Sequence, residues 1–62
     1  MNLEADIVAA AAEAMSDDEL AAAIAVLHAH ERELLLADDL DRAFRVMRDK
    51  FVLVSIQNER QH

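Results

Sequence analysis

Apolar residues at the beginning of the chain follow a helical spacing. When successive residues are turned by about 100°, one stripe collects Leu3, Ile7, Ala10 and Ala14. This spacing predicts a short helix over residues 3–15. The segment after it reads Ser16-Asp17-Asp18-Glu19, in which Ser16 and Glu19 are placed to exchange hydrogen bonds as a capping box. A second helix is therefore predicted to begin at Asp17, whose carboxylate suits the positive end of the helix dipole.

Beyond Asp17 the apolar residues form two stripes. The first contains Leu20, Ala23, Ile24, Leu27 and Leu34, and the second contains Leu40, Phe44, Met47, Phe51 and Val54. In one straight helix these stripes would lie roughly 160° apart. A turn near residues 37–39 allows both to face one core, with Asp38 as the N-cap of the next helix. We therefore predict an all-α fold in which helices 17–37 and 39–60 form an antiparallel hairpin. The predicted core consists of Leu20, Ile24, Leu27, Leu34, Leu40, Phe44, Met47, Phe51 and Val54.

Two alternatives stay open from the pattern alone. One is a single continuous helix over residues 17–60. A weaker row of apolar residues through Val26 and Leu36 continues into the second stripe, with one interruption of the seven-residue spacing. The other is a strand over residues 51–56, which have the composition of a buried strand.

The third predicted helix is apolar on two sides, which predicts burial on two sides. Its second face contains Val46, Leu53 and Ile56, and Val26 and Leu36 lie off the stripe of the second helix. In so short a chain, the surface that buries this second apolar face has to come from another molecule. We therefore predict a dimeric helical bundle with an interface at Val46, Leu53, Ile56, Val26 and Leu36.

Composition supports a partner chain. The 62 residues fit one domain, residues 1–62, and a core of that size leaves little net stability. The chain contains no Cys, which excludes disulfides and thiolate metal sites, and no Gly or Pro, which disfavours tight hairpin turns.

Charge is unevenly distributed. The net charge is −7, and residues 1–41 hold eleven of the thirteen acidic residues but only one of the six Lys and Arg residues. Arg42, Arg45 and Arg48 recur on the third helix, where pairing with the acidic second helix is expected. Nucleic acid is not the expected partner, because the net charge opposes phosphate contacts. Glu4 and Asp6 disfavour a signal peptide and no apolar run is long enough to cross a membrane, so a cytoplasmic protein without membrane contact is expected.

Few side chains in the sequence indicate chemistry. His28 and His30 are two residues apart, about 200° on a helix, so they cannot chelate one ion together. No nucleophile and base set or glycine-rich phosphate loop can be assembled, and we predict no enzymatic activity, no metal and no cofactor. Glu31 lies inside the apolar stripe and has to be hydrated at a rim, protonated or paired, for instance with Arg45 or Arg48. It could also set the register of an oligomer.

These patterns predict a small homodimeric helical protein that acts by protein–protein contact, as a regulator, inhibitor or adaptor of an unidentified protein target. One alternative is an acidic mimic of nucleic acid that blocks a nuclease or a DNA-binding protein, because carboxylates are spaced along the surface. Another is a structural assembly module.

Overall fold

The computed structural model describes residues 3–61, which form three α-helices. They are α1 (Leu3–Glu13), α2 (Asp17–Leu36) and α3 (Leu40–Arg60). The predicted all-helical fold is confirmed for these residues. Residues 51–56 lie inside α3, so the alternative of a strand there is wrong. The chain also leaves the helix between Leu36 and Leu40, whereas the continuous-helix alternative required it to run through.

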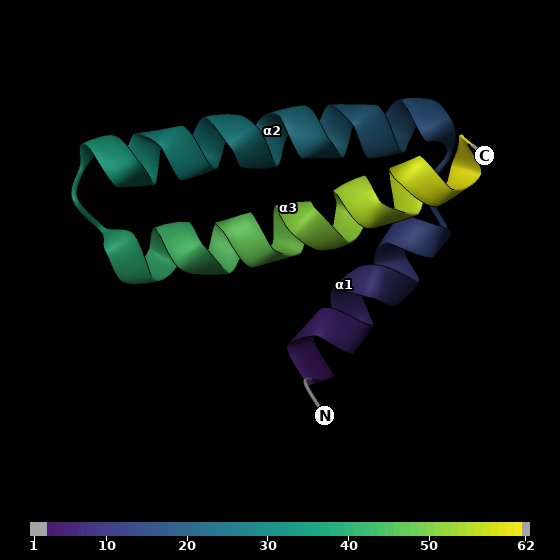
Figure 1. The fold of residues 1–62 in the computed structure, drawn as a ribbon, viewed down its shortest axis with the longest axis horizontal. Helices are drawn as coiled ribbons and strands as arrows, with labels where there is room; N and C mark the ends of the chain where they lie inside the picture. The colour runs from purple at the N-terminus through teal and green to yellow at the C-terminus, as the bar shows by residue number, and fades with distance from the viewer. Residues whose placement is uncertain (1–2, 62) are drawn as a thin grey trace.

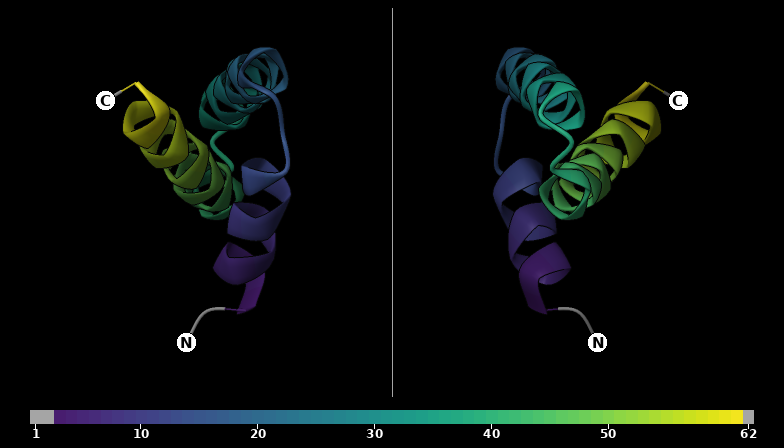
Figure 2. Two further views of the ribbon diagram at one scale, coloured as in Figure 1. Left: turned by 90° about the vertical axis from the view of Figure 1, so that its right-hand side faces the viewer. Right: turned by 90° about the vertical axis from the view of Figure 1, so that its left-hand side faces the viewer.

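The three helices form a small open assembly. α2 and α3 lie side by side and run in opposite directions, and α1 packs chiefly on α3, near the end of the chain (Figure 1). Seen along the helices, α2 and α3 diverge and α1 lies beneath them (Figure 2). The principal extents are 35 × 27 × 16 Å. With so small a thickness, many side chains remain at the surface.

The start of α2 is fixed by the predicted capping box. The Ser16 Oγ accepts a hydrogen bond from the Glu19 N–H at 3.1 Å, and the Ser16 N–H donates to Glu19 Oε1 at 2.9 Å. The hydrogen bond from the Ser16 backbone, followed by one from its side chain, lowers the pKa of Glu19 below its ordinary value of 4.5. Helix α2 therefore begins at Asp17, as predicted.

The end of α2 is a Schellman turn around Asp38. The Asp38 N–H donates to the Leu35 carbonyl at 3.1 Å, and the Asp39 N–H donates to the Leu34 carbonyl at 2.9 Å. Asp38 has a φ of 59°, a left-handed conformation usually taken by glycine, which this chain does not contain. The predicted N-cap role of Asp38 is wrong, because this residue reverses the chain at the end of α2. The N-cap of α3 is Asp39, whose side chain makes no capping hydrogen bond.

The buried core is concentrated where the three helices meet. Ala12, Leu20, Leu53 and Ile56 are buried there as one cluster. The partly buried residues around it are Val8, Met15, Ala23, Ile24, Leu27 and Val52. Ala43 is also buried, further along α3. From the first predicted stripe, Leu20 is buried in this core and Ile24 and Leu27 pack against it, whereas Leu34 is half-buried further along α2.

The prediction for the faces of α3 is wrong within the single chain. Leu40, Phe44, Met47 and Phe51 are exposed, and Val54 is half-buried. The side that faces the other helices instead contains Ala43, Val46, Leu53 and Ile56. Two properties explain this choice: the small Ala43 permits close helix packing, and the same face brings Lys50 to Glu31. Leu53 and Ile56 are thus buried inside the chain and Val46 is half-buried, whereas Val26 and Leu36 are exposed.

Candidate interaction surfaces

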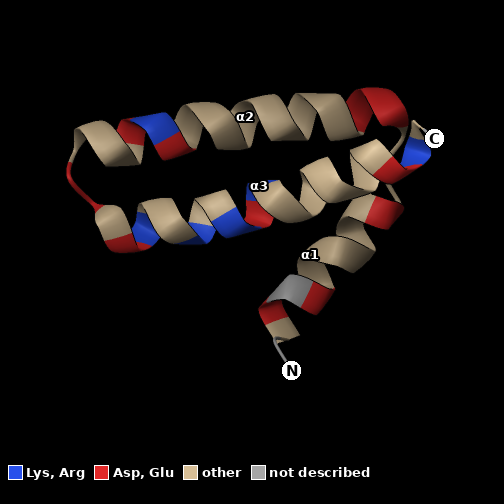
Figure 3. Ribbon diagram, viewed as in Figure 1, with Lys and Arg blue, Asp and Glu red and all other residues tan. Residues whose placement is uncertain are grey.

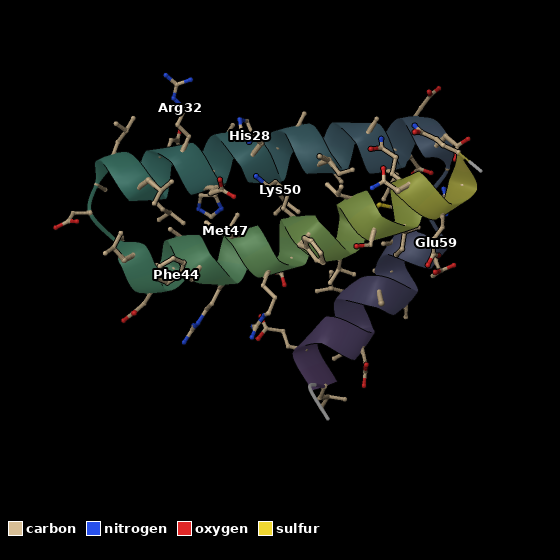
Figure 4. The ribbon with its side chains drawn as sticks, in the orientation of Figure 1. His28, Arg32, Phe44, Met47, Lys50 and Glu59 are labelled. Atoms are coloured by element: carbon tan, nitrogen blue, oxygen red, sulfur yellow. The ribbon has the colours of Figure 1, made fainter. Side chains whose placement is uncertain are left out.

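The largest apolar side chains of the protein lie on its surface. Helix α3 exposes Leu40, Phe44, Met47 and Phe51, here called the aromatic stripe. The two phenylalanines are 59% and 70% exposed, and Figure 4 shows Phe44 on the near side of α3. Because fully burying one such side chain stabilises by about 1.5–3 kcal/mol, the stripe provides a strong driving force for association.

A second apolar feature is a groove between α1 and α2, here called the α1–α2 groove. Its volume is about 440 Å³. It is lined by Ile7, Val8, Ala11 and Met15 of α1, by Ala23, Val26 and Leu27 of α2, and by Asp49 and Leu53 of α3. Asp49 is the only acidic residue in this lining, and its Oδ1 is buried without a hydrogen-bond partner among the described residues.

The two apolar surfaces belong to different sides of the molecule. At about 100° per residue, Asp49 and Leu53 project roughly 140–180° away from the centre of the aromatic stripe on α3. A molecule that covers the stripe therefore leaves the α1–α2 groove open.

Glu31 is paired between α2 and α3. Lys50 Nζ lies 2.8 Å from Glu31 Oε1 and 3.3 Å from His28 Nδ1, and Figure 4 shows the Lys50 side chain between the two helices. The Glu31 and Lys50 side chains are only 11% and 21% exposed, so the loss of either would leave a poorly hydrated charge. The predicted partners Arg45 and Arg48 are wrong: Lys50 shares the buried face of α3, whereas Arg48 pairs with Glu4 at 3.2 Å.

Arg60 attaches α3 to the end of α1. Its guanidinium donates to the carbonyls of Met15 at 2.9 Å, Glu13 at 3.2 Å and Ala12 at 3.4 Å, and to Asp17 Oδ1 at 3.0 Å. These carbonyls lie at or just after a helix C-terminus, where a positive charge is favourable; the Ala12 carbonyl also accepts from the Met15 N–H at 3.1 Å. Sequence reasoning missed this role. The available signal was the absence of a basic residue in the last turn of α1.

Opposite charges meet inside the chain. Basic residues lie mainly along α3, and acidic residues dominate the start of α2 (Figure 3). Three ion pairs join α3 to α1 or α2, through Arg48, Lys50 and Arg60. The expected pairing of Arg42, Arg45 and Arg48 with α2 is wrong for the described residues: Arg48 pairs with α1 and Arg42 contacts Asp39, whereas the pairs with α2 come from Lys50 and Arg60.

Among residues 3–61, no three or more His, Asp or Glu side chains are arranged to hold a metal ion. No helix in that range combines the length and apolar character needed to span a bilayer. No known protein family matches the chain, and neither a similar curated protein nor a similar solved structure was found. Function has to be inferred from the geometry of the chain itself.

Proposed function

We propose that this protein acts through protein–protein contact rather than catalysis, and that it self-associates through the aromatic stripe. The observation that carries the proposal is the exposure of Leu40, Phe44, Met47 and Phe51 in one row on α3. We place the contact on this surface and not at Val46, Leu53 and Ile56, because Leu53 and Ile56 are buried and Val46 is half-buried within the single chain. In the cell such a dimer would serve as a regulator, an inhibitor or an adaptor.

The proposed dimer places the stripe of one molecule on the stripe of a second across a two-fold axis. A two-fold contact is closed, because each copy offers and receives the same surface. A standard interface covers about 800 Å² on each partner, a modest part of the 4605 Å² accessible surface of this chain. Phe44 and Phe51 lie in the same row of α3, about two helical turns apart. Aromatic residues at the centre of an interface commonly contribute most of its binding energy. Two α2–α3 hairpins joined in this way form a four-helix bundle.

Nucleic-acid mimicry is the less supported alternative. Several of the carboxylates available for it are engaged within the chain, since Glu4 pairs with Arg48 and Asp17 pairs with Arg60. Association through the stripe should persist at high salt, whereas mimicry depends on screened charge contacts and should weaken.

Sedimentation equilibrium tests the proposal. We expect the wild-type chain to form a dimer at about 0.1 mM and Phe51→Glu to remain a helical monomer, because the substitution places an unpaired charge in the interface. Leu36→Glu is the control, since Leu36 is 80% exposed on α2 and outside the stripe. A monomeric wild-type chain would contradict the proposal. Dissociation by Leu36→Glu but not by Phe51→Glu would contradict the choice of surface.

A further inference from the structure

We propose that the α1–α2 groove binds one amphipathic helix of a partner protein, and that a lysine or arginine within the apolar face of that helix reaches Asp49. The groove has two helical walls, and a third helix can pack between two helices by laying its side-chain ridges into the groove. Its volume of about 440 Å³ is roughly three times that of a 150 Å³ cavity that holds benzene, so several side chains fit.

Charge determines which helix fits. Asp49 Oδ1 is buried at the groove without a hydrogen-bond partner among the described residues, in a lining that is otherwise apolar. A carboxylate oxygen in such surroundings is unfavourable until a cationic donor reaches it. Residues 3–36, which supply both walls, also contain eight acidic residues and one basic residue. The surroundings therefore favour a basic helix over an acidic one.

A second copy of the chain does not provide this helix. Arg48, Lys50 and Arg60 of α3 are already paired within the chain, and Arg42 contacts Asp39. Arg45 projects about 130° away from the centre of the aromatic stripe, so the stripe contains no basic residue that could reach Asp49 from its apolar face. If the aromatic stripe of one copy bound the α1–α2 groove of the next copy, the contact would also be head-to-tail. Such contacts add copy after copy into an open filament instead of closing into a dimer. Because the stripe and the groove project to different sides of α3, the proposed dimer leaves two grooves free for partner helices.

The test uses two synthetic peptide helices. The first has leucines at positions i, i+3, i+7 and i+10 with one lysine at i+4, inside the apolar face, and the second has methionine in place of that lysine. Fluorescence anisotropy with wild-type protein should show tighter binding of the lysine peptide. Asp49→Asn should weaken the lysine peptide about tenfold and leave the methionine peptide unchanged. Asp41→Asn removes the same charge on α3 outside the groove and should leave both affinities unchanged.

Variants at the groove rim locate the binding site. Val26 and Ile7 are 68% and 61% exposed, so Val26→Glu and Ile7→Glu should keep the fold, verified by circular dichroism, and reduce binding of the methionine peptide at least tenfold. Phe51→Glu should bind both peptides like the wild type, which separates this proposal from the dimer proposal.

The groove proposal would be overturned by equal affinity of the wild type for the two peptides, or by equal effects of Asp49→Asn and Asp41→Asn. Dissociation of the dimer by Val26→Glu would also overturn it, because the groove would then belong to self-association.

Discussion

The two ends of the α2–α3 pair are built differently. At the three-helix end, where α1 joins, Leu20, Leu53 and Ile56 are buried and Arg60 binds the last carbonyls of α1. At the two-helix end, near the Asp38 turn, Leu36, Leu40 and Phe44 are exposed, and Ala43 is the buried apolar side chain. Two helices alone have too little surface to cover large side chains on both of their outer sides. The difference indicates that α1 completes the core at one end, whereas large apolar side chains stay exposed at the other.

The largest expected effect compares core residues at the two ends. Leu20→Ala should reduce the free energy of unfolding by about 3 kcal/mol, because it opens a cavity in a packed cluster. Phe44→Ala should cost less than about 1 kcal/mol in the single chain, since its ring is mostly in water. Urea unfolding followed by circular dichroism, at a dilution where the chain is monomeric, measures both. A larger cost for Phe44→Ala would show that the two-helix end holds the core.

The next effect concerns the attachment of α1. Arg60→Met should cost about 1–2 kcal/mol and speed hydrogen exchange in α1 more than in α2, since carbonyls at the end of α1 lose their donor. Arg42→Met is the matched change at the two-helix end, where Arg42 makes an exposed 3.6 Å contact with Asp39. It should cost less than about 0.5 kcal/mol. Uniform exchange across all helices in Arg60→Met would argue against a local attachment.

A smaller effect, of opposite sign, is expected in the turn of the two-helix end. Asp38→Gly should stabilise the protein by about 0.5 kcal/mol, because glycine adopts a positive φ without the cost that other residues carry, although it gains freedom in the unfolded chain. Asp39→Gly, at a φ of −94°, is the control and should destabilise. Thermal unfolding of both variants distinguishes the two positions. Destabilisation by both would show that the Asp38 side chain contributes to the turn.

The smallest effect is the pH dependence of the capping box at the three-helix end. Because the pKa of Glu19 is lowered in the folded protein, its contribution to stability is complete above the ordinary value of 4.5 and is lost as the pH falls through the folded value. The stability difference between wild type and Glu19→Gln should therefore shrink on acidification below about pH 4.5. Glu33→Gln removes the same charge further along α2 and serves as the control. A constant difference for Glu19→Gln across this range would contradict the capping role of the carboxylate.

Local signals in the sequence predicted much of the fold. The capping box places the start of α2, and apolar spacing predicts three helices with bounds close to those observed. The buried face of α3 was not predictable from apolar spacing, because the row with Phe44 and Phe51 is the more hydrophobic of its two rows. The decision between the rows depends on contacts distant in sequence, namely Lys50 with Glu31 and Leu53 with α1 and α2. Asp38 was misassigned because a chain without glycine gives no usual marker of a left-handed turn.

The position of Arg60 has a consequence for synthesis on the ribosome. Its partners Ala12 and Glu13 precede it by 48 and 47 residues, and the core near α1 also includes the late residues Leu53 and Ile56. Helix α1 is therefore synthesised before the part of α3 on which it docks. Until α3 has been synthesised, Val8 and Ala12 lack the apolar partners that cover them in the folded protein, and the last turn of α3 supplies the guanidinium that holds the end of α1.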